Sequence, residues 1–285
     1  MARHRHELSD AEWAVLEPLL PARKTAGRHY QDHRRVLNGM LFRVNAGLAW
    51  RDLPQRYGPW QTVYSRYRRW SRSGLWDRLL QALHSELDAA GRLDWSLWCI
   101  DGSNVRAHKA AAGGGKKASG AGAEGHALGR SRGGWGTKLH LVVDGAGLPL
   151  AVHLSAGQAS EAVYAEPLLE AVRINRPSGT VRQRPERVAG DKGYSHRRIR
   201  RWLRQRHIRA VIPERRDQVA RRRGRPPQFD AQQYRRRNVV ERCVGWLKEA
   251  RAVATRFEKL ALHYLGTIKL AMIRRCLRAT LSNRP

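Results

Sequence analysis

The sequence has few cysteines and no long apolar run. Its three cysteines, Cys99, Cys243 and Cys276, lie far apart and form no CxxC pair. Isolated cysteines are typical of a reducing compartment, and their spacing excludes a zinc site built on cysteines. No apolar stretch approaches the roughly 18 residues that a membrane-spanning helix needs. Residues 1–10 are also too charged to form the apolar core of a signal peptide. We therefore expect a cytoplasmic protein that has no membrane partner.

Acidic residues are scarce as well. The 285 residues include 55 Lys and Arg but only 24 Asp and Glu, which gives a formal net charge of +31. A charge of this size opposes folding by self-repulsion, and a phosphate backbone relieves it. The composition therefore predicts a nucleic-acid partner. The 41% of apolar residues suffice for a hydrophobic core, and the length favours about two domains.

Residues 1–92 are expected to form an all-helical domain. Apolar residues recur at helical spacing over residues 11–20, 32–47, 60–73 and 75–87. The turn Gly58-Pro59 precedes a helix that carries Arg66, Arg68 and Arg69, and this order is typical of a helix-turn-helix DNA-binding unit. The alternative is a helical packing domain with a solvated basic face.

Residues 93–285 are expected to form an α/β domain. Strands are predicted over residues 95–101, 137–143, 149–154, 187–191 and 208–212, and helices over 161–174 and 195–207. This order is that of a ribonuclease-H-like mixed sheet, in which the first and fourth strands are neighbours. Asp101 and Asp191, which end two apolar runs, should then lie side by side. The Gly-rich segment 110–136 is predicted to be a loop. The basic insertion 213–232 is interpreted as a solvated loop that contacts phosphates, in preference to a minor-groove arm.

A second pattern lies near the C-terminus, before a last predicted helix over residues 266–281. Tyr234, Arg237, Glu241 and Lys248 form one narrow stripe if residues 234–248 make a single helix. A carboxylate between two cations suits a metal ligand flanked by phosphate contacts, although an ordinary Arg237–Glu241 pair one turn apart is the alternative. Together with the two aspartates, Glu241 could hold two Mg²⁺ ions for phosphoryl chemistry.

These residues carry a resemblance to a known family. The spacing Tyr234-x2-Arg237-x3-Glu241-x6-Lys248 resembles the signature around the catalytic glutamate in transposases of the IS5 family of bacterial insertion sequences, within the wider IS4-like DDE group. The segments 98–103 and 190–194 resemble the motifs of the two catalytic aspartates. Further similar blocks lie at 50–54, 58–64, 129–134, 137–140 and 237–242, so that the resemblance covers roughly residues 8–275.

The resemblance implies a DDE transposase. Such an enzyme binds the terminal inverted repeats of its element, cleaves the DNA at the element ends and transfers the strands to a target. Asp101 would bridge two Mg²⁺ ions, for which Mn²⁺ could substitute, and Asp191 and Glu241 would each bind one ion. The other implied residues are the phosphate contacts Arg237 and Lys248, Tyr234, which could stack on a base or brace the stripe, and Lys192 as a further DNA contact.

The implied partner is double-stranded DNA, bound by a homodimer or higher oligomer in the nucleoid. Two alternatives stay open: a catalytically idle DNA-binding descendant and another ribonuclease-H-like nuclease. The presence of all three acids favours an active enzyme over the first. The N-terminal helices favour a transposase over the second, because they supply a sequence reader.

Overall fold

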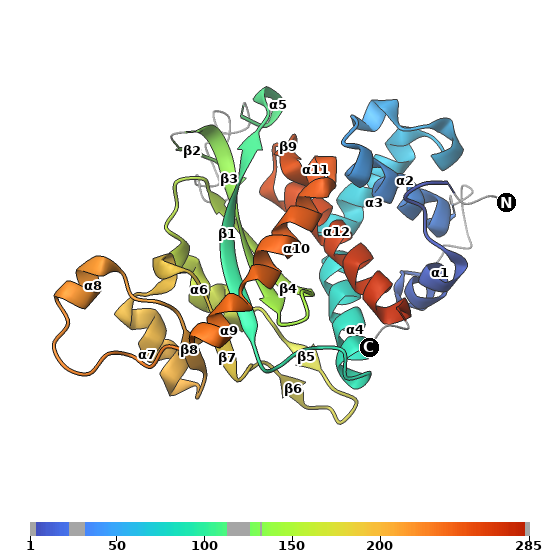
Figure 1. Ribbon diagram of the computed structural model, residues 1–285. Helices are drawn as coiled ribbons and strands as arrows, with labels where there is room; N and C mark the ends of the chain where they lie inside the picture. The colour runs from blue at the N-terminus through green and yellow to red at the C-terminus, as the bar shows by residue number, and fades with distance from the viewer. Residues whose placement is uncertain (1–3, 23–31, 113–125, 132, 283–285) are drawn as a thin grey trace.

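A mixed β-sheet lies at the centre of the protein, and helices from both ends of the chain pack beside it (Figure 1). The computed structural model describes residues 4–22, 32–112, 126–131 and 133–282. One hydrophobic core runs through the whole of this described part, from Leu8 to Leu277. Within it, no helix is both long and apolar enough to cross a membrane.

The N-terminal part is helical, as expected. Ser9 and Glu12 form a capping box that starts the first helix, and the side chain of Asp32 accepts a hydrogen bond from Arg35 N at the start of the second. Gly47 ends the second helix with φ 70°, a backbone conformation that favours glycine. The helices are α1 (Asp10–Leu16), α2 (His33–Ala46), α3 (Trp60–Arg72) and α4 (Leu75–Ala89).

The connection between α2 and α3 differs from a short helix-turn-helix linker. It contains two single 3₁₀ turns, Trp50–Asp52 and Gln55–Tyr57, before Gly58 and Pro59 lead into α3. A helix-turn-helix usually has a turn of about 3–4 residues. The first helix is also shorter than predicted, since Pro18 lies in a 3₁₀ turn, Glu17–Leu19, that follows Leu16.

Within the residues that the structure describes, the main sheet has seven strands, with β1 in a central position. Strand β1 pairs antiparallel with β3 and parallel with β7, and β7 pairs parallel with β8. This confirms that the first strand lies beside the strand at 187, as the predicted order requires. The strands are β1 (Trp98–Ala107), β2 (Gly129–Ser131), β3 (Gly134–Asp144), β4 (Pro149–Ala156), β7 (Arg187–Ala189), β8 (Arg209–Val211) and β9 (Thr255–Arg256), and β5 (Ile174–Asn175) pairs with β6 (Val181–Arg182) separately.

Three predictions about this part of the chain were wrong in detail. Asp101 does not end its strand: β1 continues to Ala107, because residues up to Arg106 pair with β3. The segment 110–136 is not all loop, since it contains β2 and the start of β3, which pair with each other; residues 113–125 of it lie outside the described residues. The predicted helix over 161–174 also ends early, at Glu170, because Ile174 pairs with Arg182.

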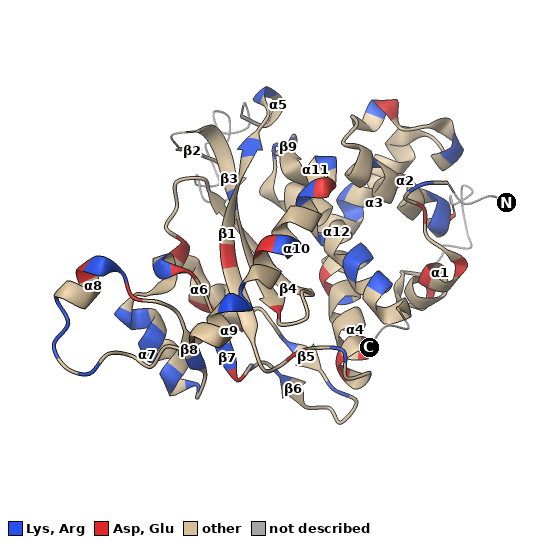
Figure 2. Ribbon diagram, viewed as in Figure 1, with Lys and Arg blue, Asp and Glu red and all other residues tan. Residues whose placement is uncertain are grey.

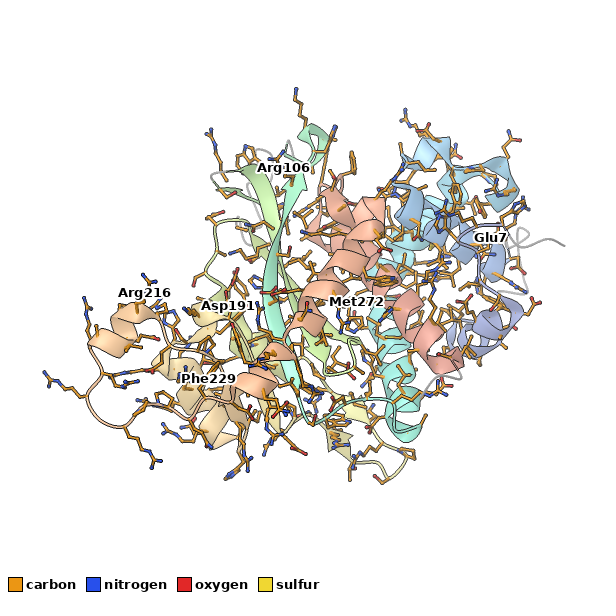
Figure 3. All side chains as sticks on the ribbon, viewed as in Figure 1. Glu7, Arg106, Asp191, Arg216, Phe229 and Met272 are labelled. Atoms are coloured by element: carbon orange, nitrogen blue, oxygen red, sulfur yellow. The ribbon has the colours of Figure 1, made fainter. Side chains whose placement is uncertain are left out.

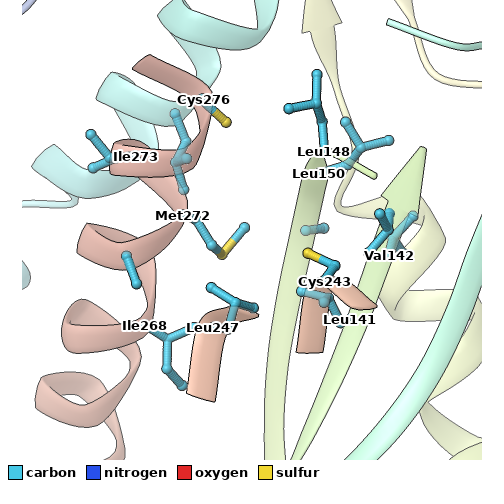
Figure 4. Close-up of a cluster of buried hydrophobic side chains, with 14 of the residues drawn as sticks. Leu141, Val142, Leu148, Leu150, Cys243, Leu247, Ile268, Met272, Ile273 and Cys276 are labelled. Carbon is cyan, nitrogen blue, oxygen red and sulfur yellow. The ribbon is translucent and has the colours of Figure 1, made fainter. Parts of the chain in front are cut away.

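Helices cover both faces of the sheet. On one face, α12 (Ala261–Leu281) packs on α4 and β4, and α10 (Asn238–Glu249) packs on β1 and β3, whereas α6 (Glu161–Glu170) packs on β3 and β4 from the other face. Figure 4 shows the resulting core, in which Met272 of α12 lies near Leu247 of α10 and the side chains of β3 and β4. The other helices are α5 (Lys109–Ala112), α7 (Arg197–Gln205), α8 (Arg216–Ala220), α9 (Ala231–Arg235) and α11 (Arg251–Ala254).

Candidate active site

Two aspartates meet where β1 and β7 run side by side. The last paired residues of the two strands are Cys99 and Ala189. Asp101 and Asp191 each follow two positions later, on neighbouring segments of the same chain. Asp191 Oδ1 accepts a hydrogen bond from Gly193 N at 2.8 Å, which fixes the turn after β7. In Figure 3, Asp191 lies beside the middle of β1. The sheet register therefore brings together two residues that are far apart in sequence.

Arg237 links Asp101 to Glu241. Its Nη1 lies 3.5 Å from Asp101 Oδ1, and its Nη2 donates to Glu241 Oε1 at 2.5 Å. The Arg237 side chain is only 15% exposed, whereas that of Glu241 is 54% exposed. The i, i+4 pair that the sequence left as an alternative thus exists, but it also reaches the aspartate on β1. Glu241 stands beside the aspartates with a guanidinium in between.

The prediction that Tyr234, Arg237, Glu241 and Lys248 lie on one helix was wrong. Tyr234 lies on α9, residues 236 and 237 form a turn, and Glu241 and Lys248 lie on α10. At this turn the backbone nitrogens of Arg236 and Arg237 bond to carbonyl oxygens three residues back, which interrupts the α-helical pattern, and Arg236 Nη2 forms an ion pair with Asp94 at 2.5 Å. Tyr234 stays close to the stripe, with its ring 5.9 Å from the Arg237 guanidinium.

Lys248 contacts the strand that carries Asp101. Its Nζ donates to Ser103 Oγ at 2.7 Å and to the carbonyl oxygen of Asn104 at 3.3 Å. Asp101 and Ser103 point to the same face of β1 because side chains alternate along a strand. Arg237 and Lys248 consequently line the side of β1 that faces α10.

A fourth carboxylate, which the sequence analysis missed, lies on the other face. A Cβ atom added to Gly102 would lie 2.7 Å from Glu161 Cδ, so glycine is needed at this position to leave room for the glutamate. Glu161 begins α6 and forms an ion pair with Lys138 of β3 at 3.2 Å. Glycine directly after Asp101, together with Lys138 in a motif block, is the only signal in the sequence that could have indicated it.

Burial strongly affects the ionisation of Asp101. Desolvation raises the pKa of this carboxyl to about 6, although Arg237 and a hydrogen bond from the Gly102 backbone oppose the rise, and Asp191 and Glu161 add to it. Beneath these acids lies Tyr194, whose buried hydroxyl makes no hydrogen bond and whose pKa is raised by burial and by the same carboxylates. A group that bears positive charge would relieve this concentration of acids.

The donor set suits a hard divalent cation. Asp101 and Asp191 present carboxylate oxygens from neighbouring strand positions, and such oxygens are the ligands that Mg²⁺ prefers. However, no three His, Cys, Asp or Glu side chains of the described residues converge as a ready set of metal ligands. Glu241 does not join the two aspartates in such a set because it forms an ion pair with Arg237. The acids fit a metal site of which two members are adjacent and the third is engaged in an ion pair.

The basic residues predicted on α3 do not share one role. Arg66 is 4% exposed and bonds to His33 Nδ1 at 2.9 Å, so the prediction that it contacts DNA was wrong. It is buried because it falls on the same helix face as Val63 and Trp70, which enter the core. Arg68 is half-buried, with its guanidinium 5.6 Å from the ring of Tyr64, and Arg69 is exposed.

Further cations surround the acids. Lys192 is exposed directly after Asp191. Lys and Arg positions also gather along α7 and around α8, on the opposite side of the sheet from the N-terminal helices (Figure 2). In this region arginines line two grooves that share Arg197, Arg200 and Arg225. The prediction that the insertion 213–232 is a loop was wrong in part, since it contains α8, and its Arg225 lines both grooves.

His140 and Asp144 have structural roles in the sheet and its turn. His140 bonds to Ser155 Oγ at 2.8 Å on the neighbouring strand. Asp144 accepts hydrogen bonds from the backbone nitrogens of Asp94, Ala146 and Leu148, and so closes the β3–β4 turn.

Comparison with known proteins identifies similar sequences among insertion-sequence proteins. Residues 8–80 match the family described as putative transposase of IS4/5 family. A putative transposase for insertion sequence element IS402 of Burkholderia cepacia is 35% identical over 136 residues, which are 47% of this chain and 60% of that protein. An uncharacterized 16.2 kDa protein of the same element is 39% identical over 107 residues, 35% of this chain and 73% of its own length.

The transposase DDE domain family matches residues 96–274, which include Asp101, Asp191 and Glu241. This match covers the sheet, all three acids and the helices on both faces. By this match, and by the geometry that gathers its acids, the chain belongs to the transposase DDE domain family, as an insertion-sequence transposase of IS4/IS5 type.

Proposed function

We propose that this chain is a DDE transposase of the IS5 family that binds the terminal inverted repeats of its element. It cleaves DNA at the element ends and transfers the strands to target DNA. The observation that carries the proposal is the parallel pairing of β1 with β7, which puts Asp101 beside Asp191, with Arg237 and Glu241 next to them.

Asp101, Asp191 and Glu241 are the proposed ligands of two Mg²⁺ ions, for which Mn²⁺ could substitute. Bound metal ions supply an activated oxygen nucleophile and stabilise the charge on the leaving oxygen. The chain's own part is to hold these acids: β1 and β7 fix the aspartates, and α10 presents Glu241. The Arg237–Glu241 ion pair is the contact with which metal binding competes.

Arg237 and Lys248 are the proposed contacts to phosphates of the element end. Arginine stays protonated at any relevant pH, so that Arg237 binds and orients but does not accept a proton. Lys248 is already directed at the β1 segment after Asp101. Tyr234 packs against the Arg237 guanidinium and Phe229, which supports a bracing role over stacking on a base. Lys192, exposed beside Asp191, is a further proposed contact.

The N-terminal helices, residues 1–92, are the proposed reader of the inverted repeats, in front of a catalytic domain over residues 93–285. Arg68 and Arg69 on α3 support this role, in a helix-turn-helix-like unit. The proposed partner is double-stranded DNA, bound by a homodimer or higher oligomer in the cytoplasm and nucleoid.

The test is a cleavage assay on a labelled duplex that carries the inverted repeat found beside the gene. Wild type should cut it with Mg²⁺ and not with EDTA. Asp101→Asn, Asp191→Asn and Glu241→Gln should each abolish cutting and leave DNA binding intact, because binding rests on cations elsewhere. Glu249→Gln is the matched control, since Glu249 is an exposed acid further along the same helix.

Retained cutting by Asp101→Asn would show that the site is misplaced. A wild-type protein that binds the repeat but never cuts it would instead favour the catalytically idle descendant. Cutting of any duplex, without preference for the repeat, would favour another ribonuclease-H-like nuclease.

A further inference from the structure

A cavity lies away from the acids. It has a volume of about 590 Å³ and opens between the α2–α3 connection and the segment that follows β9. Strand β9 pairs with Arg106 and Ala107 at the far end of β1. Ala107 is six residues beyond Asp101, which corresponds to roughly 20 Å along a strand. The cavity is thus separate from the candidate active site but on the path of the same strand.

Aromatic rings form much of its wall. Trp50 packs against Tyr64 and Tyr67, with ring centroids 5.3 and 5.0 Å away. Phe257, by contrast, is 37% exposed although it is a large apolar side chain. The Tyr67 hydroxyl donates to the His263 carbonyl, which ties this wall to α12. The cavity therefore offers rigid ring faces together with one ring open to solvent.

Polar atoms without partners line the same cavity. Among the described residues, the buried side-chain atoms that make no hydrogen bond include Arg43 Nε, Arg68 Nε, Glu258 Oε2 and His263 Nε2, and all four of these residues line this one cavity. The side chains of Arg43 and Glu258 are only 4% and 7% exposed and form an ion pair with each other at 2.7 Å, so that only Arg43 Nε and Glu258 Oε2 are left without a partner in this pair. Buried polar groups are normally satisfied, so donors and an acceptor here point to a ligand that has a hydrogen-bonding edge.

The positive charge at the rim of the cavity further restricts the chemical class of the ligand. Arg68 is half-buried at the wall, and Lys259 is exposed beside Glu258. A planar group with a hydrogen-bonding edge could stack on the rings and bond to the buried polar atoms. A phosphate attached to that group could pair with these cations. A base that is stacked and paired within a duplex cannot present its face and its edge to a protein at once.

We propose that this cavity binds one unpaired nucleotide of a DNA strand, with its base among Trp50, Tyr64 and Phe257 and its phosphate at Arg68 and Lys259. The inference rests on the proposed function to the extent that the chain binds DNA. The distance of roughly 20 Å from Asp101 corresponds to about six nucleotides at 3.4 Å each. The site therefore holds a strand at a point well away from the cut.

The experiment compares two fluorescent duplexes of one sequence, one fully paired and one that carries a single unpaired thymidine. Binding is measured by anisotropy with the full chain. Wild type should bind the second duplex about tenfold more tightly, which lies within the range for one base stacked on an aromatic ring. Phe257→Ala and Lys259→Gln should reduce this preference to about twofold or less, while their affinity for the paired duplex changes much less.

The control is Leu262→Ala. Leu262 is exposed to a similar degree, on the first turn of α12, and does not line the cavity. This variant should keep the full preference. A thermal unfolding curve for each variant confirms that it folds, which is expected for Phe257→Ala because its ring is partly in solvent.

A second arm places the base directly. Thymidine in the unpaired position is replaced by 5-iododeoxyuridine, and the complex is irradiated. Crosslinks to the peptides that contain Trp50, Tyr64 or Phe257 support the proposal, and crosslinks confined to other peptides overturn it.

The measured affinities distinguish failure of the cavity's role from failure of the proposed function. Equal affinity of wild type for the two duplexes, or full preference in Phe257→Ala, would overturn the cavity's role and leave the proposed function standing. Failure to bind either duplex would overturn the proposed function and the cavity's role together.

Discussion

Replacing Asp101 by asparagine should make the protein more stable as well as inactive. The reason is the raised pKa of this carboxyl, about 6 in the folded protein against an ordinary value of 3.8. Below pH 3.8 the group is protonated in both states and has no effect on stability. As the pH rises from 3.8 to about 6, the unfolded chain releases this proton while the folded protein still holds it, so the free energy of unfolding falls. The penalty is therefore complete at neutral pH and absent in acid.

The size of the effect follows from the shift. Two pH units correspond to about 3 kcal/mol, and the Asp101 side chain is only 21% exposed, so solvent screens little of it. The asparagine amide brings its own hydrogen-bonding requirements next to Arg237. We therefore expect a net gain of about 1–2 kcal/mol at pH 8. For a chain of this length that is a rise of roughly 2–3 °C in Tm.

The assay is thermal unfolding of both proteins in EDTA between pH 4.5 and pH 8, ends that lie on either side of about 6, the folded pKa. The increase in Tm of Asp101→Asn over wild type should be small at pH 4.5 and should level off above neutral pH. A variant that is less stable than wild type at pH 8, or a gain that does not change with pH, would refute the reasoning.

Asp144→Asn is the informative comparison. Burial also raises the pKa of Asp144 to about 6, since desolvation exceeds the effect of its hydrogen bonds. Yet both of its oxygens accept backbone hydrogen bonds. Asparagine has only one oxygen and would turn an N–H donor toward another donor. Here the same substitution should lower the Tm, because an unsatisfied buried donor costs about 1–3 kcal/mol.

Three further outcomes are expected. Arg237→Ala and Lys248→Ala should each lower the salt dependence of element-end binding by about one phosphate contact; unchanged slopes would leave both as ordinary surface contacts. Arg69→Ala should weaken DNA binding with little change in Tm, whereas Arg66→Ala should lower the Tm by removing the bond to His33; the reverse pattern would show that α3 faces DNA differently. Glu161→Gln should weaken Mn²⁺ binding measured by electron paramagnetic resonance, since it removes a charge beside Asp101; unaltered Mn²⁺ affinity would confine Glu161 to its pair with Lys138.

The sequence could predict the acids because the strand order is encoded in local patterns. Short apolar runs mark β1 and β7, and the order of strands and helices, which is that of a ribonuclease-H-like sheet, makes them neighbours, so that Asp101 and Asp191 converge. Periodicity alone could not show that β1 continues past Asp101. Beyond that residue the strand is polar or small, and only its pairing with β3 keeps it extended.

The roles of single side chains were harder to predict. Arg66 and Arg69 look alike in the sequence, but one turns into the core and the other into solvent, because the rotation of α3 is set by tertiary packing. Glu161 was missed for a related reason. Its place beside Gly102 depends on how α6 crosses the sheet, and no short-range pattern encodes that crossing. The short turn at residues 236 and 237 could not be predicted either, because no glycine or proline marks it in the sequence.

The packing of α12 between the N-terminal helices and the sheet has a consequence for synthesis. Lys269 of α12 pairs with Asp77 of α4, and Cys276 lies against His84, so each contact waits for the ribosome to add 192 residues. Until then the apolar faces of the early helices lack their partner, and such long-range contacts slow folding and favour aggregation. A nonsense mutation before residue 261 should therefore silence the gene cleanly, without leaving a DNA-binding fragment to compete with intact copies made from sister elements.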